Sequence, residues 1–110
     1  EEVDPIRMEP NGESSHHLYM LLLNPDVIAM DRMKLIQIAR ERGIELSVNY
    51  TPIHLFSWYR NRFCSAPGAF KHAEYCGANV ISLPFYTAMT KKDVDYVIEV
   101  MSELFREARR

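Results

Sequence analysis

An apolar stripe near the C-terminal end of the chain is the feature that most constrains the fold. Seven apolar side chains recur there at helical spacing: Val94, Val97, Ile98, Met101, Leu104, Phe105 and Ala108. Residues 90–93 (TKKD) precede the stripe and resemble a capping box with Asp in place of Glu. Because such a helix must bury its stripe against another layer of structure, the pattern predicts a C-terminal helix that covers one side of a core.

Three shorter apolar patterns predict the sheet under this helix. Residues 18–23 (LYMLLL) are apolar on both faces, as in a strand that is covered on both sides. Residues 44–50 (IELSVNY) alternate apolar and polar side chains, which is the period of a half-buried strand. Residues 80–83 form a third, brief strand that Pro84 ends.

Helical patterns lie between the predicted strands. Residues 32–42 are amphipathic, with Asp31 placed to cap the first turn and Gly43 placed to end the helix. Shorter helical segments are expected at residues 55–63 and 70–78. The order strand, helix, strand, helix, strand, helix predicts an α+β or α/β two-layer sandwich, with a small sheet and helices packed mainly on one face.

The first 14 residues differ from the rest of the chain. They are rich in Glu, Pro, Asn, Gly and Ser without apolar periodicity, so residues 1–14 are expected to be a tail or linker. The fold is expected to start near His16. Residues 15–110 then form one domain, since a chain of this size can bury a real core.

Composition and charge exclude several classes of protein. The net charge is −2 and no Lys/Arg-rich surface is evident, which argues against nucleic acid as a partner. No apolar run approaches the roughly 18 residues of a membrane span. The start, EEVDPIRMEP, lacks the profile of a secretory signal, so we expect a cytoplasmic protein.

The chain carries no motif of a self-contained active site. It has no Gly-rich phosphate loop and no H-E-x-x-H or G-x-S-x-G sequence, and its four histidines match no zinc-ligand spacing, so no metal is expected. The four lysines fall on predicted solvent faces or at a helix start, where imine formation is disfavoured. Cys64 and Cys76 are expected to be reduced thiols, with a bridge between them as the alternative.

Five short motifs stand in order along the chain. They are Ser15-His16-His17-Leu18-Tyr19, Arg42-Gly43-Ile44-Glu45, Tyr50-Thr51-Pro52-Ile53-His54, Ser82-Leu83-Pro84-Phe85-Tyr86 and Thr90-Lys91-Lys92-Asp93-Val94. In this order and spacing they resemble the C-terminal domain of the DegT/DnrJ/EryC1/StrS family, whose members are pyridoxal-phosphate-dependent aminotransferases of the aspartate aminotransferase-like fold (fold type I) that act on nucleotide-linked keto sugars. The resemblance covers the chain from about Ser14 to Phe105.

The resemblance implies that a partner domain is missing from this chain. In the family the pyridoxal phosphate, its lysine imine and most phosphate contacts belong to a large N-terminal domain. This chain is then the small domain, which forms part of the nucleotide-sugar cleft and has no catalytic residue of its own. The intact enzyme is expected to be a homodimer in polysaccharide or antibiotic sugar biosynthesis. The alternative is a stand-alone α+β interaction or regulatory module without enzymatic activity.

The resemblance also gives the candidate substrate-binding residues Asn49, Tyr50 and His54. Tyr50 and His54 match the family motif, whereas Asn49 stands where the family usually has His, which keeps hydrogen bonding but loses a titratable group. Alternatively, Tyr50 is a core aromatic on its strand and His54 caps a loop. The aromatic segment at residues 55–63 covers either the core or the interface with the large domain. If that domain is absent, Trp58 and Phe63 should be exposed.

Overall fold

The sheet has three strands in the order β1-β2-β3, and each strand is antiparallel to its neighbour. In this computed structural model, residues 2–6 and 10–110 are described. The α+β class that the sequence predicted is confirmed. In chain order the elements are β1 (Val3–Pro5), β2 (Tyr19–Leu23), α1 (Arg32–Glu41), the 3-10 turn η1 (Ile53–Leu55), α2 (Ser57–Phe63), α3 (Lys71–Asn79), β3 (Val80–Leu83) and α4 (Lys91–Ala108).

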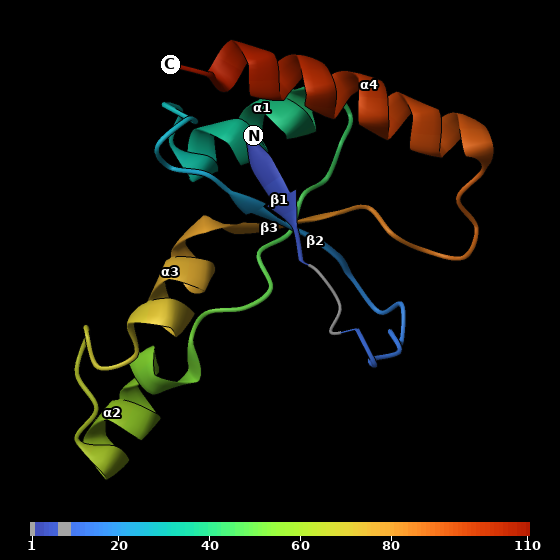
Figure 1. Ribbon diagram of the computed structural model, residues 1–110. Coiled ribbons are helices and arrows are strands. Elements are labelled where there is room, and N and C mark those ends of the chain that lie inside the picture. Colours follow the sequence, from blue (N-terminus) through green and yellow to red (C-terminus); the bar gives the residue numbers. More distant parts are fainter. Residues whose placement is uncertain (1, 7–9) are drawn as a thin grey trace.

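The core lies between the sheet and the helix pair α1 and α4. Figure 1 shows these two helices side by side over the sheet, while α2 and α3 project away from it. Leu21 and Ile81 are paired across β2 and β3, and both side chains are buried. α1 contributes Leu35 and Ala39. α4 contributes the largest group of buried side chains: Val97, Val100, Met101, Leu104, Phe105 and Ala108.

Both long helices begin as their capping signals predicted. Asp31 Oδ1 accepts hydrogen bonds from the amides of Met33 (2.8 Å) and Lys34 (3.3 Å) at the start of α1. At the start of α4, Thr90 Oγ1 accepts from the Asp93 amide (3.3 Å) while Asp93 Oδ2 accepts from the Thr90 amide (2.7 Å). These reciprocal bonds are the predicted capping box, and they satisfy amides that the helix leaves unpaired.

Two predictions about which α4 side chains are buried need correction. Val94 and Ile98, which the sequence placed on the apolar stripe, are exposed and line a groove of about 360 Å³ between α4 and the sheet. Val100 is buried although the sequence analysis left it out. The helix is therefore rotated about its axis relative to the predicted stripe, so that positions 97, 100, 101, 104, 105 and 108 face the core.

The first strand was missed. The expectation that the fold starts near His16 is wrong, because Val3–Pro5 pairs with Leu21–Leu23 and forms one edge of the sheet. The Asn24 amide extends this pairing with a hydrogen bond to the Glu2 carbonyl (3.0 Å). An edge strand is held by backbone hydrogen bonds along one side, so three residues can pair without the alternating pattern that reveals longer strands.

The strand predicted at residues 44–50 is also wrong as a regular strand. Ile44 and Leu46 are buried as the alternation requires, but the backbone pairs with β3 only at Ser47, which exchanges hydrogen bonds with Ser82 (3.1 and 2.8 Å). Beyond Ser47 the chain leaves the short β3 and runs toward α3 (Figure 1). Burial alternates because the segment lies on the core, not because it extends the sheet.

The chain thus consists of two regions that are used as names below. The body (residues 2–6, 10–49 and 80–110) holds the sheet, α1 and α4. The arm (residues 50–79) holds η1, α2 and α3. Arg32 links them, since its Nη1 donates to the carbonyl oxygens of Gly77 (2.7 Å) and Val80 (3.2 Å). In the described residues, no helix combines the length and apolar character needed to cross a membrane.

Candidate functional site

The segment that carries the three candidate residues leaves the body and enters the arm. Asn49 is half-buried, and its Oδ1 accepts a hydrogen bond from Ser47 Oγ (2.8 Å). The next residue, Tyr50, is 64% exposed, so the alternative that it is a core aromatic is wrong. The phenol is thereby presented to the surroundings at the point where the arm begins.

Pro52 fixes the segment onto α3. A Cβ atom added to Gly77 would lie 2.5 Å from Pro52 Cδ and 2.6 Å from Pro52 Cγ. Separations of this size do not occur between real side chains, so only glycine at this position lets the proline ring approach the helix backbone. The close approach also brings the Tyr50 carbonyl oxygen to 3.6 Å from the same point.

His54 lies at the centre of the arm. Its side chain is only 10% exposed, and Nε2 lies 2.8 Å from Glu74 Oε1 on α3. The imidazole also packs against the Phe70 ring, with 4.8 Å between centroids. Its backbone carbonyl accepts a hydrogen bond from Ser65 Oγ (3.0 Å). His54 therefore contacts three other parts of the arm at once.

Glu74 accepts hydrogen bonds from backbone amides as well as from His54. The Gly68 amide donates to both carboxylate oxygens (2.8 and 2.9 Å), and the Phe70 amide donates to Oε1 (3.3 Å). The hydrogen bond from His54, followed by those from the two amides, lowers the pKa of Glu74 from its usual value, although partial burial opposes this shift. The carboxylate therefore stays ionised as the acceptor of this cluster.

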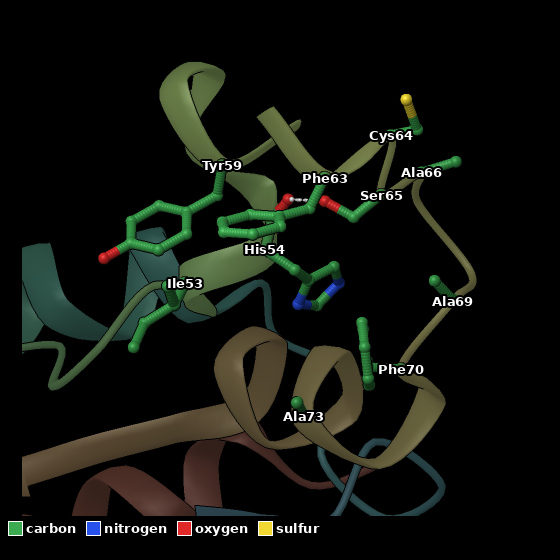
Figure 2. Close-up of a pocket in the computed structure, with 10 residues that line it drawn as sticks. All are labelled: Ile53, His54, Tyr59, Phe63, Cys64, Ser65, Ala66, Ala69, Phe70 and Ala73. Atoms are coloured by element: carbon green, nitrogen blue, oxygen red, sulfur yellow. Dashed lines mark hydrogen bonds between the residues drawn. The ribbon is translucent and has the colours of Figure 1, made fainter. Parts of the chain in front are cut away.

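A cavity of about 740 Å³ opens between η1, α2 and the start of α3. Figure 2 shows the His54 ring between Phe63 and Phe70, with Ala73 on the α3 side. The walls are mostly apolar. The lining residues are Ile53, His54, Tyr59, Phe63, Cys64, Ser65, Ala66, Ala69, Phe70 and Ala73. The structure therefore brings His54 into a cavity wall, whereas Asn49 and Tyr50 are not among the residues that line it.

The aromatic side chains of α2 face outward. Trp58 is 62% exposed and Phe63 is 65% exposed, which confirms the predicted apolar patch. Trp58 and Tyr59 pack edge to face (5.0 Å between centroids), and Tyr59 stacks on Phe63 (6.1 Å). These rings contact one another and not the core, so of the two uses predicted for this segment, covering the core is wrong.

Sequence reasoning missed Glu74, Phe70 and Ser65. Glu74 lies 20 residues from His54, and no local motif connects them. The available signal was weak: an acidic residue in the first turn of a predicted helix, three positions before a glycine. Phe70 at the N-cap of α3 offers no side-chain acceptor, and Glu74 accepts its amide proton from within the helix.

Comparison with known proteins places this geometry in a family. Residues 1–102 match the family model of the DegT/DnrJ/EryC1/StrS aminotransferase family. The chain belongs to this family. A Streptococcus pneumoniae protein assigned as a sugar aminotransferase, solved in its PLP form, superposes with a TM-score of 0.84 at 27% identity over 97% of the chain and 27% of that protein. Helicobacter pylori PseC, an aminotransferase involved in the biosynthesis of pseudoaminic acid, gives 0.81 at 26% identity over 96% of the chain and 28% of PseC.

Two curated relatives from other organisms match over similar lengths. An uncharacterized protein of Methanocaldococcus jannaschii is 38% identical over 93 residues, which cover 84% of this chain and 24% of that protein. The spore coat polysaccharide biosynthesis protein SpsC of Bacillus subtilis is 29% identical over 99 residues, or 89% of the chain and 25% of SpsC. The chain spans about a quarter of the length of these relatives.

The described residues of this family member do not fit the pyridoxal phosphate imine. Lys34, Lys71, Lys91 and Lys92 are all exposed, and Lys91 Nζ pairs with Asp95 Oδ2 (2.7 Å) at the start of α4. Imine-forming lysines are activated by removal from water, and these exposed side chains stay in contact with it. In the described part of the chain, no group of three or more His, Cys, Asp or Glu side chains could hold a metal ion. Cys64 and Cys76 are exposed free thiols, so the alternative of a bridge between them is wrong.

Proposed function

We propose that this chain is the small C-terminal domain of a pyridoxal-phosphate-dependent aminotransferase that transfers an amino group to a nucleotide-linked keto sugar. The observation that carries the proposal is the likeness to sugar aminotransferases over 97% of this chain but only 27% of their length. The domain forms part of the substrate cleft and does not catalyse by itself. When bound elsewhere in the intact protein, the cofactor supplies the electron sink for amino transfer.

The partner in this proposal is the large N-terminal domain of the same enzyme. The matched regions cover only 24% and 25% of these relatives, so most of each relative lies outside the matched region. The exposed rings of Trp58 and Phe63 and the open cavity beside them give an apolar surface of the kind that a second domain covers. We further propose that the intact enzyme is a homodimer in sugar biosynthesis. The cytoplasmic location stays a prediction.

Each candidate residue has a proposed role in the cleft. Tyr50, exposed at the start of the arm, donates a hydrogen bond from its hydroxyl to the substrate. The side-chain oxygen of Asn49 accepts a hydrogen bond from the Ser47 hydroxyl, so the side-chain N–H groups of Asn49 can donate to the substrate. His54 forms part of the wall of the cavity between η1, α2 and the start of α3. These roles bind and orient the sugar, and none of them moves a proton.

The test uses the complete protein encoded by the gene that contains this chain. We expect visible absorption from a cofactor imine that borohydride converts to a covalent label, together with amino transfer to a nucleotide-linked keto sugar. Absence of both would overturn the proposal and favour a stand-alone interaction or regulatory module.

A matched pair of tyrosine variants tests the cleft. Tyr50→Phe should lower kcat/KM about tenfold without changing the melting temperature, because it removes one substrate hydrogen bond from an exposed side chain. Tyr75→Phe removes another exposed phenol, on α3, and should leave kcat/KM unchanged. Equal effects of the two variants on kcat/KM would mean that Tyr50 does not bind the substrate.

A further inference from the structure

One carboxylate joins three segments of the arm. Glu74 projects from the first turn of α3 and accepts hydrogen bonds from the His54 imidazole and from the Gly68 and Phe70 amides. Its side chain is 24% exposed and that of His54 is 10% exposed, so water competes weakly for either group. Hydrogen bonds to a charged group contribute more than those between neutral groups. Glu74 is thus the polar centre of a region in which no residue is buried.

We propose that Glu74 is a positioning residue of the substrate cleft, which holds His54 and the loop at residues 64–70 and thereby fixes how Tyr50 is presented. This proposal rests on the proposed function, in which Tyr50 and His54 belong to that cleft. Glu74 itself need not touch the substrate.

The position of Glu74 on α3 explains how it can act on Tyr50. Glu74 and Gly77 are three residues apart, so they lie on the same face of the helix. Gly77 receives the Pro52 ring and Glu74 receives the His54 ring, which fastens the segment to α3 at two points. Tyr50 precedes the first of these points by two residues. The phenol is therefore free to face outward while the backbone that carries it is fixed.

Glu74 also determines what His54 can offer. The Glu74 carboxylate can only accept at Nε2, so this contact favours the tautomer whose lone pair lies on Nδ1. Nδ1 has no hydrogen-bond partner among the described residues. His54 then presents an acceptor in the cavity wall, which suits a hydroxyl or amide donor of a sugar substrate. Without Glu74, the tautomer with its proton on Nδ1 would no longer be disfavoured. His54 would then lose its preference for donor groups of the substrate.

The experiment compares three variants of the complete protein. Glu74→Ala removes the carboxylate, and Glu74→Gln keeps one acceptor oxygen without the charge. Asp95→Asn is the matched control, because it neutralises an exposed carboxylate on α4 whose one ion pair among the described residues is with Lys91. Amide hydrogen exchange followed by mass spectrometry reports on residues 64–70, and steady-state kinetics give KM and kcat for the sugar substrate. Cofactor absorption and the melting temperature are recorded for each variant.

We expect Glu74→Ala to raise exchange in residues 64–70 and to raise KM for the sugar, each by about tenfold, the size expected when hydrogen bonds to a charged group are lost. The change in kcat should stay within about threefold, because binding and not the chemical step is affected. Glu74→Gln should show smaller changes of the same kind, and Asp95→Asn should show none.

Two results would overturn the proposal. Unchanged exchange in residues 64–70 would mean that Glu74 does not hold the loop, and this readout does not depend on activity. Raised exchange with unchanged KM would mean that the loop does not position the cleft. The proposed function is tested independently: it fails if the wild-type protein shows neither cofactor absorption nor turnover. Even then, unchanged exchange in Glu74→Ala would show that Glu74 does not hold the loop at residues 64–70.

Discussion

The body and the arm of this chain differ in what they bury. The body holds every buried side chain in the described residues, including Leu35, Ile81 and Leu104, which are fully inaccessible. The arm holds none, and its largest side chains, such as Trp58 and Phe63, are exposed. The body is therefore stabilised by its own apolar contacts, whereas the arm is shaped by a few polar contacts and presents apolar surface outward.

The contrast explains why the candidate site lies where it does. A region whose aromatic side chains do not pack into its own core can offer them to another domain or to a ligand. Arg32, Glu74 and the Pro52–Gly77 contact then keep the arm in place. Stability and binding are thus assigned to different parts of one small domain.

The largest effect should come from truncating the core. Leu104→Ala should lower the free energy of unfolding by about 2–5 kcal/mol, because it leaves a cavity between α4 and the sheet. Trp58→Ala in the arm should change it by less than about 0.5 kcal/mol, since the indole is exposed. Urea unfolding of the 110-residue chain measures both. Similar losses would mean that the arm is as tightly packed as the body.

A smaller effect should follow from adding one methyl group to the arm. Gly77→Ala should destabilise the chain by about 1–3 kcal/mol, because the new Cβ would overlap the rigid Pro52 ring. This outweighs the roughly 0.5–1 kcal/mol that alanine gains over glycine within a helix. Cys76→Ala, at the exposed neighbouring position, is the control and should be nearly neutral. A more stable Gly77→Ala variant in urea unfolding would show that Pro52 can move away from α3.

The smallest effect concerns pH and the arm alone. The pKa of Glu74 is lowered in the folded chain, so its contribution is complete above the ordinary glutamate pKa of roughly 4.3 and is lost as the pH falls through the lower folded value. Protection of the Gly68 amide, corrected for intrinsic exchange, should therefore decrease below about pH 4. In Glu74→Gln the protection should be lower and should not change over this range. Constant protection in the wild-type chain would show that the hydrogen bonds of Glu74 do not need the charge.

The elements of the body that could be predicted are those with a local signal. The caps at Asp31 and Thr90 depend on residues three positions apart, and α1 and α4 begin where these residues predicted. The segment at residues 44–50 shows the limit. Its alternation correctly placed Ile44 and Leu46 in the core, but whether the backbone pairs along a neighbour depends on the length and edge of β3, which no local pattern encodes.

The candidate site was predictable only through the family resemblance. The motif at residues 50–54 drew attention to Tyr50 and His54, but nothing near His54 in the sequence indicated a carboxylate at position 74. The contact between His54 and Glu74 depends on how η1 lies against α3. That arrangement in turn requires a residue without a side chain at Gly77. Exposure of Trp58 and Phe63 could be inferred because the large domain was expected to be absent.

The strand at Val3–Pro5 affects how this domain can be separated from a longer protein. Trimming the chain at residue 15 would remove the outer partner of Leu21–Leu23 and leave that side of β2 with free amide and carbonyl groups. An unpaired sheet edge of this kind can pair with a strand of another molecule. The shortened protein should therefore precipitate or form mixed oligomers. A cut that keeps the pairing intact therefore lies ahead of Glu2, whose carbonyl oxygen accepts a hydrogen bond from the Asn24 amide.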